Sequence, residues 1–356
     1  MIVGACGFGS TGSSAVTDYL KEYNQFQCFD FLEFSWVSDI DGLIDLDQHL
    51  NHPHNRTGES IAAIERYRAM CNEWASILEY RGVPKKVFKK SVEDFLNAIV
   101  QTSWKWYPPE CIPFPFWKRC IRHALNLSHI ITKWQIKHGV QWEGFPFEDV
   151  YLSVKPENFD EAAKKHVSDI LQAMGADIDK PLVLDQPFPG NNPQSCFKFF
   201  DDAYAIVSDR DPRDNYVFGK IKLLGKEAGH MMPLNRVEDF VIYYKALRDK
   251  QPYKEKNDRI LFIKFEDMVY HYDATTKKIR DFLHLPENPN PKSIFNPGVS
   301  MPNTQIWKRY PQFAKDIEYI EKELSEYLFD YTGCPEPDPN AQMFVGKSPL
   351  NPLAKK

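Results

Sequence analysis

A short stretch near the amino terminus combines glycine and hydroxyl residues in a spacing that suits phosphate binding. Its members are Gly7, Gly9, Ser10, Thr11, Gly12, Ser13 and Ser14, and an apolar run precedes them. Glycines let the backbone curl with its N–H groups pointing inward, and the first turn of a following helix adds unpaired donors. The stretch therefore predicts a buried strand, an anion-binding loop and a helix over roughly 13–23.

Two general phosphate sites share this spacing. Gly7-x-Gly9-x-x-Gly12 matches the dinucleotide fingerprint, in which Asp30 or Glu33 at the end of a second strand would hold a ribose. The same glycines, followed by two serines, match a nucleoside triphosphate loop that lacks its lysine. The serines replace the small apolar residues of the first pattern, and the missing lysine removes the main phosphate contact of the second.

A second motif lies about two hundred residues later, where Arg210-Asp-Pro212-Arg-Asp214 follows an apolar strand at 203–208. Pro212 suits the first turn of a helix, so Arg210 stands between the end of a strand and the start of a helix. A guanidinium there would face the ligand crevice and bind a terminal phosphate through two parallel hydrogen bonds. The alternative is a surface ion pair with a neighbouring aspartate.

The two motifs together resemble the 3′-phosphoadenosine 5′-phosphosulfate-dependent sulfotransferase family. That family has a strand, x-x-Gly-Ser/Thr-Ser/Thr and a helix as its phosphosulfate loop, and its 3′-phosphate motif commonly reads Arg-Asp-Pro-Arg-Asp. The stretches 260–268 and 303–310 are also similar to it, so the resemblance covers about 1–40 and 148–330. It implies an α/β fold with a P-loop NTPase-like parallel sheet flanked by helices.

The resemblance also implies a binding site for 3′-phosphoadenosine 5′-phosphosulfate as co-substrate, and its chemistry requires no metal. The nucleotide-binding residues it implies are Gly9, Ser10, Thr11, Gly12, Ser13, Ser14, Arg210, Trp307, Lys308 and Arg309. The expected reaction moves the sulfuryl group to a hydroxyl acceptor. Such a reaction needs a base for the acceptor proton and donors for the charge on the leaving phosphate.

Candidates for these two roles stand at predicted strand ends. Glu33 ends the second strand beside the loop, where some members of the family carry a catalytic glutamate, and it is the expected base. Asp185, at the end of an apolar strand at 181–184, is the alternative base, and His166 on a helix face is a weaker one. Lys155, after an expected strand at 150–154, is the expected cation.

Two positions depart from the family. The residue before x-Gly-Ser/Thr-Ser/Thr is usually lysine or arginine, and it is Ser10 here. Losing one preorganised charge contact typically costs roughly a hundred- to a thousandfold in rate. Phe218 stands where cytosolic members have a serine that assists the arginine. A catalytically silent nucleotide-binding protein, or a kinase or oxidoreductase that uses the same loop, is therefore the alternative.

Apolar strands that alternate with helices predict one α/β domain over 1–334 with a parallel sheet. A helical insertion is expected at 43–140, after the second strand, and a proline-rich tail at 335–356. Residues 101–150 hold five of the eight tryptophans, interleaved with lysine and arginine. Aromatic faces beside cations suit a sugar ring, so a saccharide hydroxyl is a candidate acceptor, and the alternative is that these tryptophans form the aromatic core of a helical subdomain.

Composition limits the remaining classes. The chain has 356 residues, a formal net charge of −5 and a pI near 6.1, which argues against a nucleic-acid partner. Its seven cysteines are scattered and lack the short paired spacing of zinc or redox sites. No run of eighteen apolar residues and no secretory signal occurs, so no transmembrane segment is predicted and a cytoplasmic location is expected.

Overall fold

The structure is a computed structural model that describes residues 1–52, 57–80, 83–106, 133, 137–138, 148–223, 232–249 and 257–344. A five-stranded parallel sheet forms the centre of the fold, in the order β2-β5-β1-β6-β7. The strands are β1 (Ile2–Gly7), β2 (Gln27–Glu33), β5 (Leu182–Asp185), β6 (Ala203–Asp209) and β7 (Ile260–Lys264). The prediction of an α/β fold with a parallel sheet flanked by helices is confirmed.

The strand order creates a crevice at one edge of this sheet. From β1 the chain crosses to β2 on one side, whereas from β6 it crosses to β7 on the other side. Because these connections diverge, a ligand crevice is expected at the carboxyl ends of β1 and β6. The glycine-rich loop follows β1 and Arg210 follows β6, so both motifs lie at this crevice.

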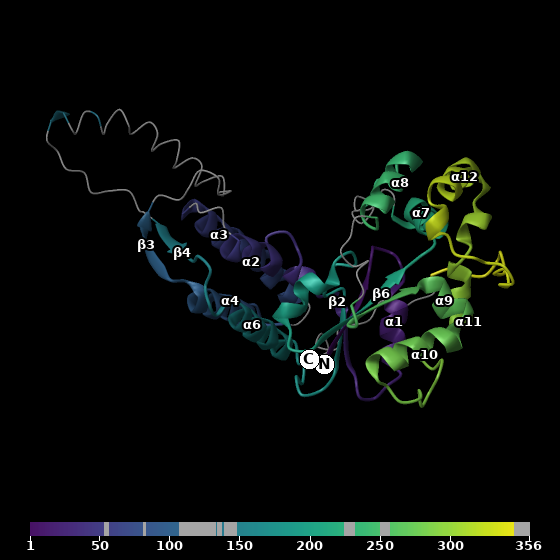
Figure 1. The fold of residues 1–356 in the computed structure, drawn as a ribbon, viewed down its shortest axis with the longest axis horizontal. Coiled ribbons are helices and arrows are strands. Elements are labelled where there is room, and N and C mark those ends of the chain that lie inside the picture. Colours follow the sequence, from purple (N-terminus) through teal and green to yellow (C-terminus); the bar gives the residue numbers. More distant parts are fainter. Residues whose placement is uncertain are drawn as a thin grey trace.

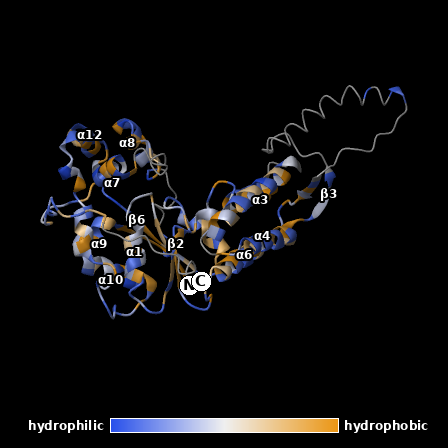
Figure 2. Cartoon of the chain, turned by 180° about the vertical axis from the view of Figure 1, so that it is seen from behind, coloured by the Kyte–Doolittle hydropathy of each residue, from blue (hydrophilic) through white to orange (hydrophobic). Residues whose placement is uncertain are grey.

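Apolar side chains bury the sheet on both faces, as the alternation of side chains along a strand requires. Val3 and Ala5 of β1 pack in one cluster with α1 (Ser13–Leu20), α9 (Phe265–Tyr270) and α10 (Tyr272–Leu283). Cys6 of the same strand packs on the opposite face with Leu184, Val207 and the helices inserted after β2. Figure 2 shows apolar residues concentrated on the central strands.

A helical arm projects from one side of the sheet, between β2 and β5 in the chain (Figure 1). It comprises α2 (Leu43–Asn51), α3 (Thr57–Tyr80), α4 (Lys85–Ile99), β3 (Thr102–Trp106), β4 (Glu148–Leu152) and α6 (Phe159–Ala173). Within it, α3 packs against α2 and α4, and α4 packs against α6. The arm thus contains a two-stranded ribbon as well as helices.

The expectation that the strand near 150–154 joins the parallel sheet is wrong. β4 instead pairs antiparallel with β3, and Val150 lies opposite Trp104. Val150 is buried, whereas Asp149 is exposed, so only one face of the strand is covered. A half-exposed strand of this kind is typical of an antiparallel ribbon and cannot be the doubly covered strand of a parallel sheet.

The carboxyl-terminal part packs a third apolar cluster beside the sheet, built mainly from α7 (Pro212–Phe218), α8 (Val237–Ala246) and α12 (Ala314–Glu323). The short helix α11 (Pro297–Ser300) lies near α9. Single turns and short helical segments are η1 (Ser35–Val37), η2 (Pro193–Phe199), η3 (Gly219–Leu223), η6 (Met301–Asn303), η7 (Ile306–Arg309), η8 (Pro311–Phe313) and η9 (Ser325–Tyr327). Residues 335–344 contain no helix or strand. Among the described helices, none has the length and apolar character needed to cross a membrane.

Candidate functional site

The glycine-rich loop is a tight curl between β1 and α1. Gly9 and Gly12 adopt φ values of 83° and 87°, a left-handed conformation that glycine tolerates best, and Ser10 shares it with φ 57°. A Cβ atom at Gly12 would lie 2.5 Å from the Phe265 ring. Two independent reasons therefore favour glycine at position 12: its left-handed φ and the lack of space for a Cβ atom beside Phe265.

Hydrogen bonds of Thr11 join the loop to β6. Its hydroxyl accepts a hydrogen bond from the Phe8 N–H (3.1 Å) and donates one to the Ser208 carbonyl (2.7 Å). The Ser208 hydroxyl in turn donates to the Thr11 carbonyl (2.8 Å). The Thr11 side chain is buried, so its hydroxyl shapes the loop and only its N–H group remains to meet a ligand.

The N–H groups of residues 9–14 have no hydrogen-bond acceptor in the described part of the chain. The first N–H groups of a helix lack intrahelical partners, and they carry the positive end of the helix dipole. These N–H groups therefore remain available to an anion in the loop and at the start of α1.

Arg210 reaches the loop from the neighbouring strand. Its guanidinium donates to the Ser10 carbonyl (3.3 Å) and to the Asn303 carbonyl, while its Nε has no acceptor among the described residues. The guanidinium also lies over the rings of Phe218 and Phe265, at 5.6 and 5.4 Å from their centroids. The side chain is only 4% exposed, so the surface ion pair is not its role.

Buried carboxylates lie close to this guanidinium. Burial, followed by the charges of Asp211 and Asp214, raises the pKa of Glu266, which accepts a hydrogen bond from the Asp211 N–H (3.0 Å). Arg210 acts in the opposite direction on the pKa of Glu266 and of Asp214. Arg213 forms ion pairs with Asp211 and Glu321, and these ion pairs stabilise the position of α7.

A cavity of about 660 Å³ opens on the loop. Residues 7–14 form one wall, and Glu33, Asp39 and Asp185 contribute three carboxylates. Glu33 and Asp185 are Cα partners across β2 and β5, which brings both proposed bases to the same cavity. The described lining contains no lysine or arginine.

The two carboxylates differ in electrostatic environment. Burial, followed by the negative charges of Glu33 and Asp30, raises the pKa of Asp185 to about 7. Partial burial and then the charge of Asp39 raise the pKa of Glu33, whose side chain is more exposed. Asp185 therefore changes its charge near neutral pH, which is the property of an effective general base.

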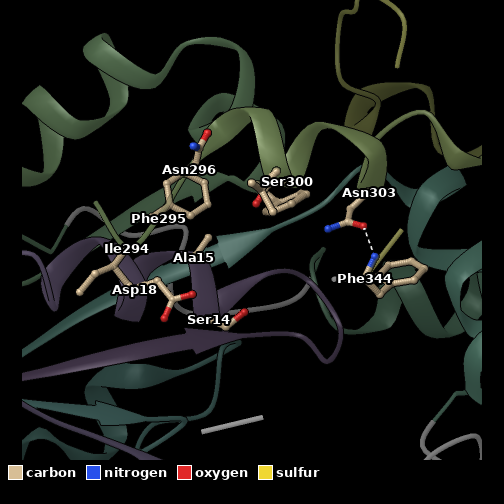
Figure 3. Close-up of a pocket in the computed structure, with 11 residues that line it drawn as sticks. Ser14, Ala15, Asp18, Ile294, Phe295, Asn296, Ser300, Asn303 and Phe344 are labelled. Atoms are coloured by element: carbon tan, nitrogen blue, oxygen red, sulfur yellow. Dashed lines mark hydrogen bonds between the residues drawn. The ribbon is translucent and has the colours of Figure 1, made fainter. Parts of the chain in front are cut away.

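A second cavity of about 460 Å³ lies beside α1 and is lined by Ser14, Ala15 and Asp18. Figure 3 shows Ser14, Ala15 and Asp18 of α1 facing residues of the 294–303 segment, with Phe344 at one end. Phe265 and Asn303 line it, and the same two residues contact Arg210. Because Ser14 lines both cavities, they adjoin at the end of the loop.

The predicted nucleotide-binding residues at 307–309 do not line either cavity. Trp307 stacks on Arg213, whose guanidinium lies 4.6 Å from the ring centroid. Lys308 pairs with Glu336, and Arg309 donates to the carbonyls of Asp338 and Ala341. In this structure the three side chains thus hold α7 and the 335–344 segment, not the loop.

Lys155 is also apart from the loop. It is exposed after β4, its N–H donates to the Leu50 carbonyl (2.8 Å), and it lines neither cavity. The displacement of β4 from the parallel sheet explains this placement. His166 is a core residue, bonded to Tyr67 and Ser91. Of the tryptophans expected at the acceptor side, Trp117, Trp134 and Trp142 lie outside the described residues, as does the side chain of Trp106.

Sequence reasoning missed two residues of the site. Gln186 contacts both ends of the loop, and Asn303 offers its carbonyl to Arg210. Gln186 directly follows Asp185 at a strand end, so the rule that ligands meet strand ends could have indicated it. Asn303 begins the 303–310 stretch, but its contact with Arg210 has no side-chain signal because Asn303 makes it through its backbone carbonyl.

Comparison with known proteins does not identify the chain: no protein-family model matches it, and no curated protein matches it significantly. Among the described residues, no group of three or more histidine, cysteine, aspartate or glutamate side chains is arranged to hold a metal ion.

Proposed function

We propose that this protein is a sulfotransferase that uses 3′-phosphoadenosine 5′-phosphosulfate and a hydroxyl acceptor. The observation that carries the proposal is the contact between Arg210 and the Ser10 carbonyl, which joins two motifs separated by 200 residues. A doubly phosphorylated adenosine needs two anion sites at one nucleotide's length. The loop supplies one site and the buried guanidinium supplies the other.

The nucleotide would occupy both cavities. The phosphosulfate lies against the N–H groups of residues 9–14 in the larger cavity, and the nucleoside enters the smaller one, past Ser14. The 3′-phosphate replaces the Asn303 carbonyl at Arg210 and takes its unpartnered Nε–H, which gives the bidentate pair that arginine favours. The strand order β2-β5-β1-β6-β7 supports a P-loop NTPase-like scaffold, in which the phosphate loop follows the central strand.

The larger cavity also has room for an acceptor. Asp185 or Glu33 takes the proton of the acceptor hydroxyl while its oxygen forms a bond to sulfur. The bond from sulfur to the 5′-phosphate oxygen breaks, and adenosine 3′,5′-bisphosphate leaves. The N–H groups of the loop stabilise the charge that develops on the leaving phosphate.

One observation favours a second candidate, a catalytically silent nucleotide-binding protein. Ser10 stands where the family carries a cation, and the described lining of the larger cavity contains no lysine or arginine. Among the described lining residues, only uncharged donors would then stabilise the leaving phosphate. Nucleotide binding without sulfate transfer would distinguish this candidate from an enzyme.

Calorimetry with adenosine 3′,5′-bisphosphate, ATP and NADH tests the proposal. The wild type is expected to prefer the bisphosphate, and Arg210→Ala should abolish that preference. Arg236→Ala is the matched control, because Arg236 is exposed and pairs with Glu238. Transfer of labelled sulfate to a panel of alcohols and saccharides then separates the enzyme from the silent protein. Equal affinity for all three nucleotides would refute the proposal.

A further inference from the structure

The loop has a support that no motif contains. Gln186 follows β5 and bridges the two ends of the loop through its side-chain amide. The Gly7 N–H donates to its Oε1 (3.1 Å), and its Nε2 donates to the Ser13 hydroxyl oxygen (2.9 Å). Gly7 ends β1 and Ser13 begins α1, so one side chain spans the loop.

The direction of these hydrogen bonds is fixed. A backbone N–H can only donate, so the amide must turn its oxygen toward Gly7 and its NH₂ group toward Ser13. The Ser13 oxygen is then an acceptor for Gln186, and its own proton must point elsewhere. No acceptor for that proton occurs in the described part of the chain, and Ser13 lines the larger cavity.

We propose that Gln186 is a positioning residue that turns the Ser13 hydroxyl proton into the cavity, where it is donated to a phosphate oxygen of the ligand. This inference rests on the proposed nucleotide site. Thr11 provides the contrast within the same loop, because its hydroxyl proton is already used on the Ser208 carbonyl. Of these two hydroxyls, only that of Ser13 is left for the ligand.

The backbone of Gln186 indicates that its side chain is held in place. Its φ is 50°, a left-handed conformation that is strained for a residue with a Cβ. Its N–H donates to the Ala5 carbonyl of β1 (3.0 Å), which ties this strained turn to the strand that carries the loop. The backbone of Gln186 is therefore fixed relative to β1, and this places its side-chain amide between Gly7 and Ser13.

A double-mutant cycle between Gln186→Glu and Ser13→Ala tests the proposal. An ionised glutamate can only accept, so it would take the Ser13 proton and turn the hydroxyl away from the ligand. Affinity for adenosine 3′,5′-bisphosphate is measured by calorimetry at pH 8. Ser13→Ala should weaken binding about tenfold to a hundredfold in the wild type, as expected for a hydrogen bond to a charged group. In the Gln186→Glu background it should change binding less than about twofold.

The cycle cancels the repulsion that the new charge adds, because this repulsion is present in both glutamate variants. Gln186→Gly is a second, neutral variant that relieves the strained φ and leaves the Ser13 hydroxyl free to rotate. Ser13→Ala should still weaken binding there, by a smaller factor than in the wild type. Gln172→Glu is the matched control, since Gln172 donates to Ser168 in the same way on the exposed face of α6.

Equal factors for Ser13→Ala in the wild type and in Gln186→Glu would overturn the proposal, as would no effect of Ser13→Ala in the wild type. The proposed function fails by a different result, namely a wild type that binds ATP as well as the bisphosphate. The same cycle with ATP would then still measure whether residue 186 controls Ser13, because either ligand places phosphate on the loop.

Discussion

Asp185→Asn is expected to stabilise the protein at alkaline pH and to impair its activity. The carboxyl of Asp185 lines the larger cavity beside Glu33. Burial, and then the negative charges nearby, raise its pKa from 3.8 to about 7. The fold therefore favours the neutral carboxyl, and asparagine imitates that neutral form in size and shape.

The sign and size of the effect follow from this pKa. Below pH 4 the carboxyl is protonated in both the folded and the unfolded state, so it contributes no pH dependence. Between pH 4 and 7 the unfolded chain releases the proton while the folded chain keeps it, and the free energy of unfolding falls as pH rises. A rise to about 7 corresponds to a loss of about 4 kcal/mol. Because the cavity admits solvent, roughly 2–4 kcal/mol is the expected range.

Denaturant unfolding of the wild type and Asp185→Asn from pH 4 to 8 measures this difference. The variant should gain stability steadily over the wild type between pH 4 and 7 and remain ahead above pH 7. Asp201→Asn, the same change at an exposed position, should show a difference within about 0.5 kcal/mol at every pH. A stability difference for Asp185→Asn that does not change with pH would refute the reasoning.

Two further predictions concern the loop and the arm. Gly190→Ala should weaken nucleotide binding, because a Cβ atom there would lie 2.3 Å from the Gly7 carbonyl oxygen and displace the loop; calorimetry and a melting curve separate lost binding from lost folding. Burial lowers the pKa of His166 to about 3, so wild-type stability should fall as pH drops from 6.5 toward 3. His166→Phe should reduce that slope in acid unfolding, even though it loses the bonds to Tyr67 and Ser91; an unchanged slope would contradict this account.

The sequence predicted the elements around the site because their signals are local. The apolar run ending at Gly7, the acid at Glu33 and the Arg210 motif each mark a strand end, and each lies where predicted. Because neighbouring strands of this sheet are parallel, their carboxyl ends lie at the same edge, and the residues that follow them are brought together. The meeting of Arg210 with Ser10 is therefore a consequence of topology, since β1 and β6 pair directly.

Other elements lie elsewhere than expected because their positions depend on contacts between distant residues. The run near 150 is apolar enough for a parallel strand, but its partner Thr102–Trp106 lies in the arm. Lys155 therefore stands away from the loop. Likewise, Lys308 and Arg309 are cations in the expected segment, but their partners are Glu336 and the carbonyls of the 335–344 segment. Local sequence does not reveal which partner a surface cation takes.

The raised pKa of Asp185 and the absence of a cationic side chain at position 10 both affect the charge of the larger cavity. In the proposed function, the phosphosulfate would be held by the N–H groups and the Ser13 hydroxyl of a cavity whose described lining has no lysine or arginine, and each ionised carboxylate there would oppose that binding. With a pKa of about 7, roughly half of the Asp185 carboxyls are neutral at pH 7, which lessens their repulsion of the anion, and the ionised half is the form that can accept the proton of the acceptor hydroxyl. An acid of ordinary pKa would add a permanent negative charge to a cavity whose described lining has no cation to offset it. In the proposed function, the raised pKa of Asp185 would therefore lessen its repulsion of the anionic donor and give its ionised form the basicity that a general base needs.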